Sequence, residues 1–506
     1  MNIKNRFSKQ VCFFKDNYIC FLMSLTFSII SFGIFIFPHY SQDTYEKIIV
    51  DASLSLNEYF KFSVVRQIKG GRYSLGVAKL IIKAIGLYEV SLGVWGNFTA
   101  IGLMSINIVY LYNMIKEFFS NKVRIVVFCL SVCVFLCPCF ADWFLWSEVA
   151  LYYFLGVLLS NIGISLLYKN KILKGLLYLF IAIGFYQIIL SFFVYFYILI
   201  LMLKLEKEVR EQKKFINIYV RGVMKGILIY VLLAGINILL AKSHPRVSSY
   251  SDKFNNLVTV LKTQKHIWMM DTLGRKTYIY LCVFVIALLI LGIKILMLTK
   301  ENKKYVLYGL ITIISILGIY LSIFVSHVFV EAWITQRTIV MFYALTPFLL
   351  FVCLKVFGEE IGQSMSIIIF ILILGLGLTY TIKANNLAMG VIKSNEMDKF
   401  IALLIDDKIK RYERENGHVV ENIVYVDDES ITWSYPDVFC SYDLKIRDWS
   451  VKWARNYMFR MYTGRNLKEF KCPEYIYNSV YKEKNWNCYS EEQIYFEGNT
   501  VYIGVY

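Results

Sequence analysis

The chain has 506 residues, of which 58% are hydrophobic and 18% are charged. Soluble globular proteins average about 45–50% apolar and about 25% charged residues. Because the excess lies in long continuous blocks, the composition excludes a soluble enzyme, a disordered chain and a small disulfide scaffold, and it indicates a polytopic membrane protein. The formal net charge is +17, but much of the surplus lies between hydrophobic blocks and forms no basic stripe with interleaved aromatic residues. We therefore expect no nucleic acid partner.

Eleven stretches are apolar enough to be candidate membrane spans, since a crossing needs about 20 such residues. They are 18–37, 90–113, 123–141, 148–168, 172–186, 188–203, 226–241, 278–298, 305–325, 338–356 and 366–382. The region 172–203 could be one long tilted helix or two short ones, and lysines on both flanks favour two spans or a re-entrant pair. The lysine and arginine bias places the N-terminus inside and the tail outside.

The composition changes near residue 383, where charged residues return. We expect a membrane domain over 1–382 and an extracytoplasmic α/β domain over 383–506. The spacing of apolar residues predicts a helix over 394–415, a strand at 423–426, a second helix over 450–462 and a terminal hairpin near 493–503. The fold class expected is therefore mainly α: a membrane helical bundle of about 11 spans with a small C-terminal α/β domain.

The cysteines fall into two groups. Cys129, Cys133 and Cys137 step by four along one helix face, which could be a metal or redox strip but is more typical of small apolar packing residues. In the tail, Cys440, Cys472 and Cys488 allow one disulfide and leave one thiol over.

The common motifs of soluble enzymes are missing, so we look for polar residues at the outer membrane boundary. Asp43 and Glu46 lie three residues apart just after the first apolar stretch. A later segment, 75–88, has the pattern of an interfacial amphipathic helix, with Lys79 and Lys83 placed to reach head groups. A carboxylate here could deprotonate an acceptor hydroxyl while cations stabilise a departing phosphate; alternatively, the two acids cap the next helix.

Three further segments carry candidate residues at the outer boundary. Asp142 and Glu148 flank Trp143 and Trp146, whose rings suit membrane-belt anchors better than a sugar platform. Tyr186 and Gln187 lie at a helix break, which suits a cavity. Glu331 and Arg337 lie late in the chain, and an intramembrane arginine needs a partner such as phosphate unless it reaches the interface.

The order of these motifs resembles a known family. Gln42-Asp43 follows the first span, Gly71-Arg72-Tyr73 comes about thirty residues later, Gly184-Phe185-Tyr186-Gln187 sits at a helix break, and Arg337 comes late. The pattern resembles the type II Gtr glucosyltransferases, within the C-type (GT-C) group of membrane glycosyltransferases. That family has two adjacent acids in the first loop, and here the first of them is Gln42.

The resemblance implies a hexosyltransferase of the bacterial cytoplasmic membrane that uses a polyprenyl-phosphate-linked sugar, expected to be glucose. Its acceptor would be a polysaccharide such as O-antigen, or a lipid-linked glycan, on the outer face. The implied roles are a general base at Asp43, with Glu46 as the alternative; phosphate binding by Arg72 and Arg337; and a substrate pocket of Tyr73, Glu148, Tyr186, Gln187 and Glu331. Besides its substrates the chain would contact membrane lipids, and we expect no metal and no other cofactor. A polysaccharide polymerase or ligase, and a lipid-linked sugar transporter or flippase, are the competing readings.

Overall fold

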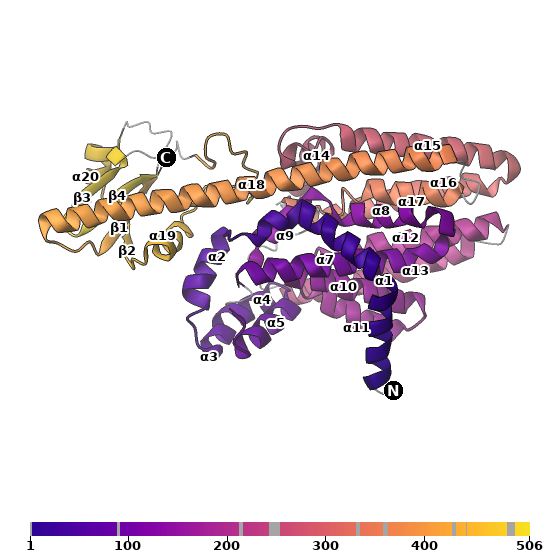
Figure 1. Ribbon diagram of the computed structural model, residues 1–506, viewed down its shortest axis with the longest axis horizontal. Coiled ribbons are helices and arrows are strands. Elements are labelled where there is room, and N and C mark those ends of the chain that lie inside the picture. The colour runs from indigo at the N-terminus through magenta and orange to yellow at the C-terminus, as the bar shows by residue number, and fades with distance from the viewer. Residues whose placement is uncertain are drawn as a thin grey trace.

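The computed structural model describes residues 3–88, 92–211, 216–241, 253–329, 334–357, 363–427, 432–441, 443–482 and 491–505. A helical bundle occupies one end of the molecule and a small sheet the other (Figure 1). The bundle helices are α1 (Ile3–Phe32), α7 (Val94–Ile115), α8 (Arg124–Phe135), α9 (Ala141–Leu145), α10 (Ser147–Tyr168), α11 (Ile172–Ile183), α12 (Ile189–Arg210), α13 (Ile216–Ala241), α14 (Lys253–Trp268), α15 (Ile279–Glu301), α16 (Lys304–Phe329), α17 (Leu345–Phe357) and α18 (Gln363–Asn416).

The chain is mainly helical and polytopic, as predicted, but the described residues contain fewer candidate spans than eleven. Eight helices are long and apolar enough to cross a membrane, or nine if the bent pair formed by α8 and the segment 138–145 is one span. The stretches predicted at 172–186 and 338–356 instead form the short helices α11 and α17, of 12 and 13 residues. At about 1.5 Å per residue, neither can cross about 30 Å of hydrocarbon.

Helix α18 joins the two ends of the molecule. It runs for 54 residues and extends from the bundle to the sheet (Figure 1). The span predicted at 366–382 and the helix predicted at 394–415 are parts of this one helix, because no proline separates them. The boundary between 382 and 383 thus falls inside α18, and the division into two domains stays a prediction.

The C-terminal unit contains the predicted α/β elements. A four-stranded sheet has the order β2-β1-β4-β3, in which β1 is parallel to both neighbours and β3 and β4 form an antiparallel hairpin. Its elements are β1 (Asn422–Asp427), the 3-10 turn η11 (Asp448–Ser450), α19 (Arg455–Thr463), β2 (Lys468–Phe470), α20 (Glu474–Ile476), the π-helical turn η12 (Tyr477–Tyr481), the 3-10 turn η13 (Glu491–Gln493), β3 (Ile494–Glu497) and β4 (Thr500–Val505).

The predicted cysteine roles have different outcomes. Cys133 is buried and its thiol approaches the Ile373 carbonyl of α18 at 3.7 Å, as a packing residue would. Cys440 and Cys472 are free thiols, so they do not form the disulfide considered for the tail. Cys488 lies outside the described residues.

A run of short helices lies on one side of α18, beside the bundle, and its first helix, α2, reaches the C-terminal unit (Figure 1). They are α2 (Gln42–Glu46), the π-helical turns η2 (Lys47–Asp51) and η3 (Phe60–Val64), α3 (Leu56–Tyr59), α4 (Val65–Lys69) and α5 (Tyr73–Ala84). The remaining short turns are η1 (Gly33–Ile36), η4 (Lys116–Phe118), η5 (Asn121–Val123), η6 (Pro138–Phe140), η8 (Asp271–Leu273) and η9 (Gln336–Thr338). Tyr45 of α2 is fully buried in the main apolar core of the C-terminal unit, so α2 packs on both parts of the molecule.

Candidate active site

Helix α2 presents Asp43 beside Lys47. Ser41 caps the helix through reciprocal hydrogen bonds with Thr44, so neither Asp43 nor Glu46 serves as the N-cap. Asp43 stands in the first turn with a side chain that is 43% exposed, and Lys47 lies one turn later with its Nζ 3.5 Å from Asp43 Oδ2. A partly open carboxylate is therefore held next to a cation.

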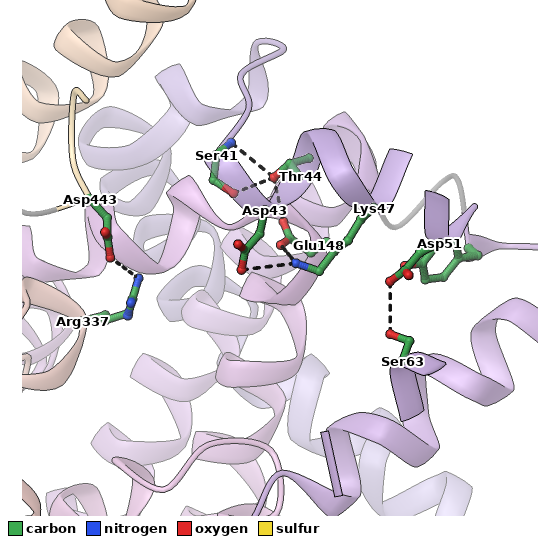
Figure 2. A network of polar contacts seen from close by, with 10 residues as sticks. Ser41, Asp43, Thr44, Lys47, Asp51, Ser63, Glu148, Arg337 and Asp443 are labelled. Atoms are coloured by element: carbon green, nitrogen blue, oxygen red, sulfur yellow. Dashed lines mark hydrogen bonds and ion pairs between the residues drawn. The ribbon is translucent and has the colours of Figure 1, made fainter. Parts of the chain in front are cut away.

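The buried carboxylate of Glu148 supports α2 from the start of α10. Glu148 is 1% exposed and accepts hydrogen bonds from Lys47 Nζ at 3.0 Å and from Thr44 Oγ1 at 3.0 Å. A buried charge needs such partners, because removing it from water without them is very unfavourable. These contacts fix the face of α2 that carries Asp43 (Figure 2).

The charges around Asp43 keep it ionised. Burial alone would raise the pKa of Asp43, but Lys47, and then Arg337, lower it below its ordinary value. Burial likewise opposes the charge of Lys47, yet Asp43 and Glu148 together raise the pKa of Lys47. Both groups are therefore charged at neutral pH.

Arg337 lies on the other side of Asp43 (Figure 2). Its Nη1 is 2.8 Å from Asp443 Oδ2 of the C-terminal unit and 3.7 Å from Oδ1 of Asp142. The guanidinium carbon lies 4.8 Å from the centroid of the Trp146 ring. Burial opposes its charge, but Asp142 and Asp443 raise the pKa of Arg337. The guanidinium is held by two carboxylates and an aromatic face, yet its side chain remains 19% exposed.

Two motifs that are more than a hundred residues apart meet at the helix break between α11 and α12. Gln187 Nε2 donates to the Gly70 carbonyl at 2.6 Å, and Leu75 N donates to the Gly184 carbonyl at 3.1 Å. The Tyr73 ring stacks on Phe180 at 4.6 Å. Tyr73 and Gln187 thus hold the two segments together.

This contact places Arg72 over an aromatic surface. Its guanidinium carbon lies 5.3 Å from the centroid of Tyr186, and Tyr186 stacks on Tyr153 at 4.4 Å. Burial raises the pKa of Tyr186 to about 12, although Arg337 and Arg72 both act to lower it. Two arginines far apart in the chain therefore converge near one tyrosine.

Several predicted residues have other positions. Glu46 lies close to Tyr457 of α19. Burial raises the pKa of Tyr457, and the charge of Glu46 raises it further. Glu331 lies outside the described residues. Lys79 is 2% exposed and Lys83 donates to the Asp51 carbonyl at 2.7 Å, so the head-group role expected for these lysines is wrong.

The aromatic turn also differs from the expectation. Trp143 is fully buried, and its indole donates to the Arg337 carbonyl at 3.0 Å. It is therefore an internal packing residue and not a membrane-belt anchor. Asp142 accepts from the Arg337 backbone nitrogen at 2.9 Å, which makes this turn a support for Arg337.

Sequence reasoning missed Lys47, Tyr153 and Asp443. The signal for Lys47 was its position four residues after Asp43, where a helix brings the two side chains together. Tyr153 and Asp443 had no local signal, since each reaches the site from a distant part of the chain.

The arrangement suits a transfer reaction in which phosphate is the leaving group. An ionised, partly open carboxylate can accept a hydroxyl proton, and the neighbouring guanidinium and ammonium groups can stabilise a departing anion. An aromatic surface beside them can support a sugar ring.

Comparison with known protein families identifies the chain's family. The family described as glucosyl transferase GtrII matches residues 55–354, which is more than half of the chain and includes Arg72, Glu148, Tyr186 and Arg337; Asp43 precedes the matched segment. No curated protein and no solved structure matches the chain. The chain therefore belongs to the GtrII glucosyl transferase family.

Proposed function

We propose that the protein transfers glucose from a polyprenyl-phosphate-linked donor to a hydroxyl group of an envelope polysaccharide or lipid-linked glycan. The transfer would take place at the outer face of the bacterial cytoplasmic membrane, by a GT-C type enzyme. The observation that carries the proposal is the position of Asp43, a partly open carboxylate between Lys47 and Arg337. The apolar helices suit a lipid-borne donor, because such a donor can enter from the bilayer.

In the proposed reaction, Asp43 accepts the proton of the acceptor hydroxyl. The acceptor oxygen bonds to the anomeric carbon of glucose as the bond from that carbon to the phosphate oxygen breaks, and polyprenyl phosphate leaves. Arg337 and Arg72 bind the phosphate and stabilise its added charge. The phosphate would replace Asp443 at the Arg337 guanidinium, since both present anionic oxygens to it.

The remaining site residues have supporting roles in this proposal. The Tyr186 ring packs against the Arg72 guanidinium and lines the sugar pocket. Glu148 holds α2 in place through Lys47. Tyr73 and Gln187 keep the Arg72 segment in place.

The test compares the envelope glycans of cells that contain the wild-type protein, no protein, Asp43→Asn or Glu46→Gln. We expect one glucose branch to be absent without the protein and with Asp43→Asn, and present with Glu46→Gln, because Glu46 lies toward α19. Western blots of membranes control for insertion. A changed chain length with unchanged sugar composition would indicate a polymerase or ligase instead, and unchanged glycans would point to a transporter.

A further inference from the structure

The side chain next to Asp43 points into the C-terminal unit. Gln42 is 5% exposed, and its Nε2 donates to Asp448 Oδ1 at 3.0 Å. Asp448 is 1% exposed and begins η11. Since successive helix residues point in different directions, Gln42 and Tyr45 contact the C-terminal unit while Thr44 and Lys47 contact Glu148.

Asp448 belongs to a buried polar network that joins three segments. Its Oδ2 accepts from Asn395 Nδ2 at 3.3 Å, and Asn395 Oδ1 accepts from the Tyr40 backbone nitrogen at 2.7 Å. The Asp448 backbone nitrogen donates to Asp398 Oδ2 at 3.1 Å. The network therefore ties the chain around Gln42 to α18 and to the C-terminal unit.

A helix as short as α2 cannot hold its own position. It has five residues and continues directly into η2, and even an isolated helix of about ten residues is marginal in water. Its place depends on the contacts at its two faces: Thr44 and Lys47 with Glu148 on one, and Gln42 and Tyr45 with the C-terminal unit on the other.

We propose that Asp448 is a positioning residue for glucosyl transfer, which acts through Gln42 to hold Asp43 at the acceptor hydroxyl. This inference rests on the proposed function. It gives the C-terminal unit a direct role in the geometry of the reaction, although Asp448 itself touches neither substrate.

The same contact explains why position 42 carries an amide. A carboxyl group there would be the third acid beside Asp448 and Asp398. Burial already raises the pKa of both of these acids, so ionising a further one in this buried site is strongly unfavourable. The amide donates to Asp448 without having to bind a proton, which a carboxyl group at this position would need to do. We expect Gln42→Glu to lower transfer, and we expect Gln42→Glu with Asp448→Asn to recover part of the loss because one of the three acids is removed.

The main experiment is a double-mutant cycle on the full chain in nanodiscs. The variants are Gln42→Ala, Asp448→Ala and the pair, with Asp448→Asn as the conservative variant that keeps an acceptor for Gln42. Transfer is followed with polyprenyl-phosphate-[14C]glucose and envelope polysaccharide from cells that lack the protein. Arg465→Ala is the matched control, because Arg465 pairs with Asp406 and Glu413 within the C-terminal unit and does not contact α2.

We expect each alanine variant to lower kcat about 10–100-fold with the donor KM within twofold, since small displacements of a reacting group can reduce rates by about two orders of magnitude. The pair should lose no more than the worse single variant, because both remove the same contact. Asp448→Asn should keep most of the rate. Additive losses, or an equal loss in Arg465→Ala or Asp448→Asn, would overturn the inference.

A second measurement does not depend on activity. Hydrogen exchange of the backbone amides of 42–47 should quicken in Gln42→Ala and Asp448→Ala, and should not change in Arg465→Ala. If the wild type transfers no glucose, the proposed function fails; if exchange at α2 is unchanged in both variants, the positioning role fails whatever the transfer assay gives.

Discussion

Gly71 and Gly86 form a natural pair for testing how the Arg72 segment is held. Both have left-handed backbone conformations, with φ of +76° and +75°. A Cβ at Gly71 would lie 2.8 Å from Gln187 Nε2 and 2.9 Å from Asn237 Oδ1, whereas a Cβ at Gly86 would meet nothing within 4 Å. The two alanine variants therefore share the backbone strain and differ in the contacts.

The expected losses of stability follow from these contacts. Alanine in the left-handed region costs about 1–2 kcal/mol, which is the full effect expected for Gly86→Ala. Gly71→Ala also displaces the bonds from Gln187 to the Gly70 carbonyl and from Asn237 to the Gly71 carbonyl, each of which contributes about 1 kcal/mol. Its total loss should be about 3–4 kcal/mol.

Thermal unfolding of the full chain in nanodiscs measures the difference. Gly71→Ala should unfold at a clearly lower temperature than Gly86→Ala, and it should raise the donor KM because Arg72 follows directly. Gly86→Ala should leave the KM unchanged. Equal midpoints and equal KM values for the two variants would refute the claim that the contact with Gln187 and Asn237 positions Arg72.

Two further substitutions address single charges. In Arg337→Lys the charge remains, but the shorter lysine cannot reach Asp142 and Asp443 together over Trp146. The donor KM should therefore rise at least about 10-fold. An unchanged KM would show that Arg337 does not bind the donor phosphate. Among the described residues Lys79 has no hydrogen bond or ion pair, and burial, then the charge of Lys47, lower its pKa from 10.5 to about 8. The native state therefore binds this proton less tightly than the unfolded state, and stability rises with pH between about 8 and 10.5. Lys79→Met should raise the unfolding midpoint at pH 7 and flatten that rise, and a lower midpoint at pH 7 would contradict this account.

The sequence was a good guide to the helices and a poor one to the number of spans. Apolar runs identify segments that avoid water. They do not show whether such a segment is surrounded by lipid or by other parts of the protein. Nearly all of α17 is buried within the protein, so Leu345–Phe357 is apolar because other helices enclose it. Helix α11 differs from a span for another reason: Leu173 and Leu177 are exposed, but the helix has only 12 residues.

Part of the candidate site could likewise be predicted from the sequence, and part could not. The motifs around Arg72 and Tyr186 could be assigned to one site in advance because their order resembles a known family, and the structure brings them together. The partners of Arg337 could not be predicted, since Asp443 lies more than a hundred residues away and no periodic pattern links the two. Gln42 resembled a lost acid in the sequence, and only its contact with Asp448 shows what the amide does.

These contacts predict that the chain needs its C-terminal unit for transfer. A chain that ends at residue 382 would cut α18, remove Asp443 from Arg337 and Asp448 from Gln42, and expose Tyr45, which is fully buried in the C-terminal core. The membrane helices before residue 382 would remain, so the truncated protein should still reach the membrane. We expect it to transfer no glucose in the assay above. Wild-type transfer by the truncated chain would show that α2 holds Asp43 in place through Glu148 alone, and that the contacts from the C-terminal unit serve another purpose.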